Sequence, residues 1–493
     1  MLRSKYLLES CTANRGTIVL DNMHRLSTNS SNSNNGYANI WGECLRYIIY
    51  PAYETFSGRR ILKKFEFLEA SQWWPYEKLR DYQWQNIQRM VKYAYEKNSY
   101  YRRLFMKFGI HPTDIKSYKD FANLPIIRKK DIMENLDDFV SDGFDKNSLK
   151  KDMTSGSTGE KLIFYLDQNT CDYRAAADLR SHQWYHREMG EKRFVIWSPM
   201  SFDSIIAKIS NGCRNILLGD YITSSYQLNE VKLGAIVDEI KKMKPKALSG
   251  YVSALTILAN FIKARSIEDV KIESIIPTAE TLFIHQRDLF EEVFHGRVFN
   301  RYGSHEFTGV AHECDHHTGM HINVENVYLE VVEAGRPAAE GQLGELVITD
   351  LHNFGMPLIR YGIGDLGALR EESCPCGRGL PLLERVEGRV YDVIHCPNGN
   401  IQTGTFFCKL IRSVDEIREF QVIQEAKTRI RFRLAMDGEL RQHSKHFIEE
   451  TVKKHCGEEM EIHFELAKTI DPLASGKRRY IISLMESPLN SAY

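Results

Sequence analysis

The chain has 493 residues, enough for several compact units and a large hydrophobic core. Lysine plus arginine and aspartate plus glutamate number 65 each, so no net charge draws the chain to nucleic acid or to an anionic membrane. No apolar run reaches the roughly 18 residues of a membrane-spanning helix, and no signal peptide core follows the N-terminus. We therefore expect a cytoplasmic protein that binds a small molecule and neither inserts into a membrane nor binds nucleic acid.

The N-terminal part of the chain predicts a disordered leader followed by helices. Residues 1–36 end in a Ser- and Asn-rich run without apolar periodicity, which cannot offset its ordering entropy by burial. Apolar clusters between Trp41 and Ala70 predict one or two helices. Apolar and aromatic residues recur at helical spacing from Trp74 to Phe108, which favours a helical packing face. A turn into another helix follows at Leu124–Ile132.

A loop rich in glycine and hydroxyl residues precedes a strand-like run, Leu162–Leu166. Its residues are Thr154, Ser155, Gly156, Ser157, Thr158 and Gly159, followed by Glu160 and Lys161. Glycine lets successive amides point into one concavity and hydroxyls add donors, so such a loop can bind a polyphosphate. It is not a Walker A loop, because its two glycines are too close together and no Ser or Thr follows the lysine. Taken alone, the string is equally compatible with a turn between strands.

Apolar segments then alternate with amphipathic helices, which is the pattern of an α/β fold. The predicted strands are Phe194–Trp197, Ala247–Leu248, Ser274–Pro277 and Val298–Phe299, and the predicted helices are Leu228–Met243, Ser253–Ala264 and Ile284–Phe294. Ligands of open α/β sheets collect at the carboxyl ends of the strands. The segments expected just after the strands are therefore candidate binding elements: Ser249–Tyr251, Thr278–Glu280 and Asn300–Gly303.

From Val327 onward the pattern is β-rich, and a domain boundary is expected near Gly388. The β segments before it are Val327–Val332, Gly344–Thr349 and Pro357–Tyr361. We expect a large N-terminal domain over residues 37–387 and a small, mobile α+β domain over residues 388–493. The predicted elements of the small domain are Glu419–Gln424, Thr428–Leu434, a helix at Ser444–His455, and Glu461–Leu466.

Four further segments carry side chains suited to a nucleotide. Tyr302–Glu306 combines an aromatic ring, a glycine and a carboxylate that can hold Mg²⁺. Arg360–Asp365 places an acid after a strand and two glycines, where it can accept hydrogen bonds from ribose hydroxyls. Gly388–Asp392 lies at the expected boundary, and Ser475–Tyr480 presents a lysine on the turn before the last strand. Taken singly, a string such as Tyr302–Glu306 is more often a turn than a site, and Arg360–Asp365 is as often a turn as a site. A basic turn such as Ser475–Tyr480 is usually only solvated.

In this order, these segments and the glycine loop resemble the adenylate-forming (AMP-binding) superfamily, and specifically its phenylacetate-CoA ligase-like family. The strings Gly-Glu-Leu-Val-Ile-Thr, Met-Pro-Leu-Ile-Arg-Tyr and Gly-Asp-Leu make the match specific, and it covers most of the chain from Trp41 onward. The strings Glu69–Trp74, Asn98–Arg102 and Leu124–Ile126 resemble the CapK-type proteins of capsular and exopolysaccharide gene clusters. The resemblance implies a large multilayer domain of β-sheets and packed helices, with a small α+β domain on a hinge.

The resemblance also implies an activity. A carboxylate attacks the α-phosphate of ATP, pyrophosphate leaves, and the acyl-adenylate passes its acyl group to CoA, as in acyl-CoA ligases. Transfer to an amine or hydroxyl without CoA is an alternative, as is an inactive nucleotide-binding relative that is an assembly partner in polysaccharide biosynthesis. The partners would be a carboxylic acid, ATP, and CoA or another acceptor, and a homodimer is compatible with this function.

By the same resemblance, Glu306 would hold Mg²⁺ and Lys477 would bridge the attacking carboxylate and the α-phosphate, which makes both catalytic candidates. Tyr302 would cover the adenine and Asp365 would bind the ribose. The other nucleotide-binding candidates are Thr154, Ser155, Gly156, Ser157, Thr158 and Gly159 for the pyrophosphate, with Ala279, Glu280, Gly303, Ser304, His305 and Arg389. The acid is expected near Trp197–Ser204, Tyr251, Thr278 and Ala279. Three positions depart from the family pattern: Glu160, His305 and Tyr391.

Three cysteines and nearby histidines form a candidate metal site. Ten cysteines in so long a chain do not make a disulfide scaffold, and Cys374 and Cys376 are too close for an ordinary bridge. With Cys314 and one histidine they supply a tetrahedral zinc set, or else remain unliganded thiols. Members of this branch carry a similar zinc knuckle, so the resemblance implies structural Zn²⁺. His321 is the favoured fourth ligand, with His316 and His317 as alternatives.

Overall fold

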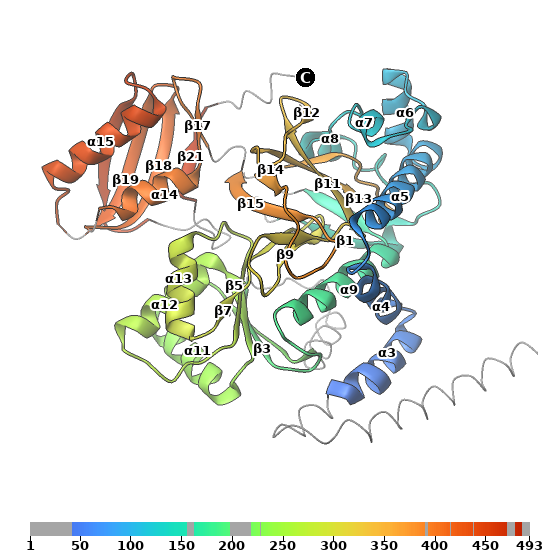
Figure 1. The fold of residues 1–493 in the computed structure, drawn as a ribbon, viewed down its shortest axis with the longest axis horizontal. Coiled ribbons are helices and arrows are strands. Elements are labelled where there is room, and N and C mark those ends of the chain that lie inside the picture. Colours follow the sequence, from blue (N-terminus) through green and yellow to red (C-terminus); the bar gives the residue numbers. More distant parts are fainter. Residues whose placement is uncertain are drawn as a thin grey trace, which may run out of the picture.

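The computed structural model describes residues 42–154, 162–197, 218–226, 228–389, 393–414, 416–436, 438–470 and 479–485. Several predictions fall outside these ranges: the leader, loop residues Ser155–Gly159, Lys477, and hinge residues Tyr391 and Asp392. The architecture is α/β, with a large multilayer region (residues 42–389) and a smaller sheet region (residues 393–485), as Figure 1 shows. Within the described ranges, no helix combines the length and apolar content needed to cross a membrane.

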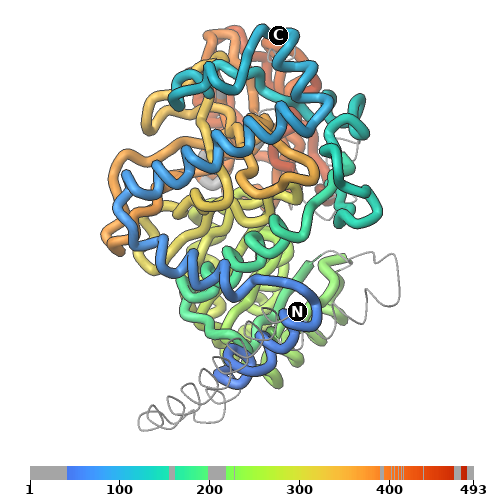
Figure 2. Tube along the Cα trace, turned by 90° about the vertical axis from the view of Figure 1, so that its right-hand side faces the viewer, coloured from blue at the N-terminus to red at the C-terminus, as the bar shows by residue number. Residues whose placement is uncertain are grey.

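The described chain begins with helices. They are η1 (Leu45–Ile49), α3 (Tyr50–Ser57), α4 (Ile61–Ser71), α5 (Tyr76–Lys97), α6 (Ser99–Phe108), η2 (Pro112–Asp114), α7 (Tyr118–Phe121), α8 (Lys129–Glu134) and η3 (Lys146–Ser148). The helical pattern over Trp74–Phe108 forms two helices, because Asn98 adopts an extended conformation and its side chain caps α6 by accepting from the Tyr101 N–H at 3.1 Å. Figure 2 shows the blue helices crossing the outside of the large region.

A 13-stranded sheet organises the large region, in the order β12-β11-β13-β14-β15-β10-β9-β8-β6-β5-β3-β4 with β7 also paired to β6. Its strands are β3 (Arg193–Trp197), β4 (Asp220–Ser224), β5 (Ala247–Tyr251), β6 (Ser274–Thr278), β7 (Arg297–Val298), β8 (Arg301–Ser304), β9 (Thr308–Glu313), β10 (Met320–Ile322), β11 (Val327–Glu333), β12 (Arg336–Pro337), β13 (Gly344–Asp350), β14 (Tyr361–Arg370) and β15 (Leu382–Arg389). Strands β3 to β8 pair in parallel and β8 to β15 pair antiparallel, so the sheet changes character at β8.

Helices and one hairpin accompany this sheet. They are α9 (Gln168–Trp184), α11 (Glu230–Met243), α12 (Val252–Ala264) and α13 (Ile284–Phe294), with β1 (Lys150–Met153) and β2 (Ile163–Leu166) as a separate antiparallel pair. The predicted helices at Leu228–Met243, Ser253–Ala264 and Ile284–Phe294 are confirmed, the last at both ends. Their apolar stripes pack onto the parallel strands in one cluster that includes Leu255 and Phe290.

The structure corrects several predicted strand limits. Ser249–Tyr251 was expected to follow a strand but completes β5, and Asn300–Gly303 lies largely within β8 rather than after a strand. Of the predicted strand Pro357–Tyr361, only the last residue is in a strand, and Asp365 lies inside β14 rather than in a turn. The glycines of β14 permit a local irregularity: Gly364 has a φ of 82° and the register with β13 shifts between Glu345 and Val347, while pairing on both sides keeps Asp365 within the strand.

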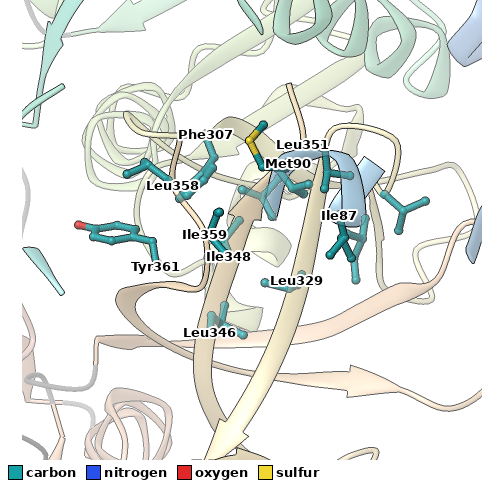
Figure 3. Packing of buried hydrophobic residues seen from close by; sticks show 14 of the residues in the cluster. Ile87, Met90, Phe307, Leu329, Leu346, Ile348, Leu351, Leu358, Ile359 and Tyr361 are labelled. Atoms are coloured by element: carbon teal, nitrogen blue, oxygen red, sulfur yellow. The ribbon is translucent and has the colours of Figure 1, made fainter. Parts of the chain in front are cut away.

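The main core lies between α5 and the antiparallel half of the sheet. Figure 3 shows Ile87 and Met90 of α5 beside Leu329, Leu346 and Ile348 of β11 and β13, and all five side chains are buried. This packing holds β13 and β14 in place and therefore also positions the polar residues at the ends of these strands.

The small region has its own sheet and core. Its elements are β16 (Ile394–His395), β17 (Ile401–Gln402), α14 (Gly404–Arg412), β18 (Ile417–Ala426), β19 (Arg429–Met436), α15 (Gln442–Cys456), β20 (Glu461–Ala467) and β21 (Ile481–Ser483). Its four-stranded sheet has the strand order β20-β19-β18-β21. Together with helices α14 and α15, this sheet has the predicted α+β pattern. One residue of the large region, Phe283, is buried in the hydrophobic cluster of the small region.

Candidate active site

A cavity of about 2350 Å³ opens at the carboxyl ends of the parallel strands and extends to the small region, which contributes Tyr480 and Ile481 to its wall. Most of the described candidate residues line it: Thr154, Ala279, Glu280, Tyr302, Gly303, Ser304, His305, Glu306 and Asp365. Arg389 is described only for its backbone, which pairs with that of Asp365 across β14 and β15. Segments far apart in the sequence thus share one cavity, as the α/β pattern predicts.

Tyr302 and Asp365 form one unit of this cavity. The Tyr302 hydroxyl donates a hydrogen bond to Asp365 Oδ2 at 2.9 Å, across β8 and β14. The ring is largely buried, and the bond holds the carboxylate beside the edge of the ring. A nucleoside that covers this ring would therefore bring its ribose hydroxyls towards the same carboxylate.

Glu306 follows β8 and is held from two sides. Tyr361 donates its hydroxyl proton to Glu306 Oε1 at 3.3 Å, and buried Arg174 donates to the Glu306 backbone carbonyl. Arg174 is itself paired with Asp350 at 2.9 Å. The Glu306 side chain is therefore a positioned carboxylate on the cavity wall, which is a suitable oxygen ligand for Mg²⁺.

The sequence did not single out Arg174 or Tyr361 as supports of Glu306. The partners are 132 and 55 residues away along the chain, and no local spacing connects them. Tyr361 belongs to the family string Met-Pro-Leu-Ile-Arg-Tyr, which could have indicated a role near the site. Arg174 lies on a helix that the sequence did not predict, and no pattern indicated its role.

Glu280 and Gly303 have structural roles beside the cavity. The Glu280 carboxylate accepts hydrogen bonds from the Ser253 N–H at 2.6 Å and from Ser253 Oγ at 3.0 Å, so it caps the first turn of α12. At Gly303, a Cβ atom would lie 1.9 Å from the Thr308 carbonyl oxygen, so the close approach of β8 and β9 requires glycine. His305 is exposed to the cavity.

One face of the parallel strands forms a second part of the cavity. Ser249 and Tyr251 of β5 line it together with Trp197 of β3 and Thr278 of β6. The rings of Trp197 and Tyr251 stack at 4.3 Å between centroids with an interplanar angle of 11°. This is an apolar wall with hydroxyls nearby, at the position expected for the acid; residues 198–204 of that prediction lie outside the described residues.

Cys314, His321, Cys374 and Cys376 come together as a compact group, with one ligand atom of each within 4.8 Å of all the others. Cys314 Sγ lies 3.7 Å from Cys374 Sγ, and His321 Nε2 lies 3.3 Å from Cys376 Sγ. With Zn–S bonds of about 2.3 Å, ligand atoms of a tetrahedral zinc site are about 3.5 to 3.8 Å apart. The donor set and its dimensions therefore fit Zn²⁺.

Local hydrogen bonds favour the thiolate form of two of the three cysteines. Burial opposes ionisation of Cys374 and Cys376, but hydrogen bonding with Thr318 and His321 respectively outweighs it and lowers the pKa of both thiols, whereas burial raises the pKa of Cys314. The other ring nitrogen of His321 faces the Leu380 carbonyl at 3.3 Å, which orients the ring. His317 instead contacts Glu313 at 3.3 Å, so His321 is the histidine of the group.

Known proteins resemble this chain in sequence and in architecture. Residues 394–484 match the family model of the CapK C-terminal domain. The phenylacetate-coenzyme A ligase of Thermus thermophilus is 26% identical over 71% of this chain and 79% of its own length. Protein CapK of Staphylococcus aureus is 25% identical over 81% of this chain and 88% of its own length.

The structure also resembles a solved one. A 2-hydroxyisobutyryl-CoA ligase, crystallised in the postadenylation state with an acyl-AMP, superposes with a TM-score of 0.66 at 19% identity, covering 83% of this chain and 90% of that one. At this identity the similarity shows a shared fold, and it extends over both the large and the small region.

Proposed function

We propose that this chain activates a carboxylic acid as its acyl-adenylate and transfers the acyl group to CoA. The chain is a member of the phenylacetate-CoA ligase-like, CapK-type family and an adenylate-forming ligase of the acyl-CoA type. One observation carries the proposal: Tyr302, Asp365 and Glu306 line the same cavity as the stacked pair Trp197 and Tyr251. A nucleotide site and a site for an apolar acid thus adjoin.

In the first step, ATP would bind with its adenine on Tyr302 and its ribose on Asp365. Glu306 would ligate Mg²⁺, which supplies positive charge against the phosphates. Thr154–Gly159 would hold the departing pyrophosphate by amide and hydroxyl donors. Lys477 would reduce the repulsion between the attacking carboxylate and the α-phosphate.

In the second step, the acyl group would pass to CoA after the small domain, residues 388–493, rotates on its hinge. The division into this small domain and a large domain over residues 37–387 is part of the proposal, as is a cytoplasmic location. Zn²⁺ on the Cys314 group would be structural, because three thiolates and one imidazole leave no open position for a substrate.

The second candidate is transfer to an amine or hydroxyl acceptor in polysaccharide biosynthesis. It is favoured by the match of residues 394–484 to the CapK C-terminal domain, because this is the region that would face the acceptor in the second step. A purely nucleotide-binding assembly partner is the third alternative, and it requires no turnover.

ATP–pyrophosphate exchange over a panel of carboxylic acids tests the proposal. Exchange should occur with some acids and fall at least a hundredfold in Glu306→Gln and Lys477→Ala. Lys263→Gln, which alters an exposed lysine paired with Glu292, is the matched control and should keep its activity. Exchange with none of the acids would refute the ligase function, and AMP release that does not require CoA would favour the second candidate.

A further inference from the structure

A chain of buried and half-buried charges lies beneath the face of the parallel strands that lines the acid part of the cavity. Asp178 of α9 is 2.9 Å from Arg301 Nη2 on one side and 3.4 Å from His182 Nε2 on the other. His182 in turn lies 3.1 Å from terminal nitrogens of both Arg187 and Arg193. The chain therefore runs along α9 from the carboxyl ends of the strands towards their amino ends.

Asp220 closes the chain at its far end. Its carboxylate accepts two hydrogen bonds from Arg193, at 2.7 and 2.9 Å, and one from Arg187 at 2.8 Å. Arg193 is thus matched to a carboxylate by a two-point contact and has little capacity left for a ligand. Arg193 and Arg301 both line the cavity, with side chains 11% and 18% exposed, but only Arg193 is held by a two-point contact.

The charges of this group do not balance. Three guanidinium groups, of Arg187, Arg193 and Arg301, face two carboxylates, of Asp178 and Asp220. Burial and the nearby arginines lower the pKa of His182 to about 4, so its ring is neutral at pH 7. Among the described residues, one positive charge is therefore in excess in a group that is only partly exposed to water, which favours an anion nearby. The excess arises where Arg187 and Arg193 share Asp220, because Arg301 faces Asp178 alone.

Within the described residues, the neighbouring side chains do not supply that anion. His312, paired in register with Arg301 on β9, carries no carboxylate. The next acid on the same strand, Glu313, is already paired with Arg287 at 2.7 Å. Glu306, also on the cavity wall, accepts from Tyr361 and is the candidate Mg²⁺ ligand.

The contact of Arg301 with Asp178 is weaker than that of Arg193 with Asp220. Asp178 Oδ1, the atom nearest to Arg301, is buried but makes no hydrogen bond with any described residue, so this pair is close without being aligned. A guanidinium has five N–H donors in a planar fork. Arg301 is therefore the member of the group that can donate to a ligand in the cavity.

The sheet places Arg301 beside the acid site. Across neighbouring strands, the backbone of Tyr251 is aligned with that of Thr278, and the backbone of Thr278 with that of Arg301. The three side chains therefore lie at one level on one face of the sheet. The stacked rings of Trp197 and Tyr251 form the apolar side of this space. An acid with its carbon skeleton on these rings would have its remaining polar group near Arg301.

We propose that Arg301 determines substrate specificity by binding a second carboxylate of the acid, so that the preferred substrates are dicarboxylic acids. This inference rests on the proposed ligase function. One carboxylate is activated at the nucleotide, and the other accepts a charge-assisted, two-point hydrogen bond from Arg301. This second carboxylate adds an anion to a chain of charges that has one cation in excess.

Pyrophosphate exchange with matched pairs of acids tests this role: hexanoate against adipate, and phenylacetate against 4-carboxyphenylacetate. The wild type should have the lower KM for the dicarboxylic member of a pair. Arg301→Gln should raise that KM about 10- to 100-fold, with kcat and the KM for monocarboxylic acids within about twofold of wild type. Arg301→Lys keeps the charge without the fork and should give an intermediate KM.

Lys263→Gln is a matched control, because this exposed cation pairs with Glu292 and does not line the cavity; it should leave both acids unchanged. Retained turnover of monocarboxylic acids shows that Arg301→Gln is folded. Exchange that is equal for both members of a pair in wild type and Arg301→Gln overturns the specificity role and leaves the ligase function standing. A raised KM for ATP with every acid also overturns it, since Arg301 would then serve the nucleotide. No exchange with any acid overturns the ligase function and this inference together.

Discussion

Phe283 provides a direct test of how the small region is held against the large one. This side chain comes from the residue before α13, yet it is 8% exposed and lies in the hydrophobic cluster of the small region. Its ring meets that of Tyr480 edge-on at 5.5 Å. A hydrogen bond from Thr403 Oγ1 to Glu387 Oε2 at 2.9 Å also joins the two regions.

Phe283→Ala should release the small region without unfolding either part. Burying a phenylalanine side chain stabilises the buried state by about 1.5 to 3 kcal/mol. If that energy is gained only in this orientation, the substitution lowers the population of the orientation about 10- to 150-fold relative to others. The distance between fluorescent labels on α12 and α15 should then become longer and broader.

Phe290→Ala is the matched control, because Phe290 lies on α13, the helix that Phe283 precedes, but is fully buried inside the large region. It should lower the unfolding free energy by about 3 to 5 kcal/mol through a cavity and leave the label distance unchanged. An unchanged distance in Phe283→Ala, or a loss of stability equal to that of Phe290→Ala, would refute the idea that Phe283 holds the orientation.

Two further predictions concern metal binding and pH. Cys376→Ser should lower the zinc content from about one ion per chain to near zero, and should lower the Tm by several degrees. Elemental analysis of purified protein measures the zinc content, and negligible zinc in the wild type would contradict this prediction. Burial lowers the pKa of His352 to about 4, against an ordinary value near 6.5, so the unfolded chain binds a proton in this interval that the folded one does not. The unfolding free energy should therefore fall as the pH is lowered from about 6.5 towards 4, and urea titrations should show a shallower fall in His352→Gln; equal slopes would contradict the assignment.

Much of the fold follows from local sequence patterns. Helix α13 was predicted at both ends because its apolar stripe and its boundaries are short-range features. Helix α9 was missed for the opposite reason: its buried residues include Arg174, Arg180 and His182, so it has no simple apolar stripe. These buried polar residues are stabilised by partners such as Glu325, which accepts from Arg180 at 2.7 Å and is 145 residues away.

The sequence by itself determined which chemistry this chain contains: an aromatic ring, carboxylates and glycines in an order typical of nucleotide-binding ligases, and three cysteines with a histidine. These are properties of residue type and local spacing, and therefore legible along the chain. Only the tertiary structure decided which groups meet, because pairing depends on contacts between distant strands and helices. It joined Tyr302 to Asp365, brought His321 to the three cysteines, and placed Arg301 at the cavity wall level with Thr278 and Tyr251.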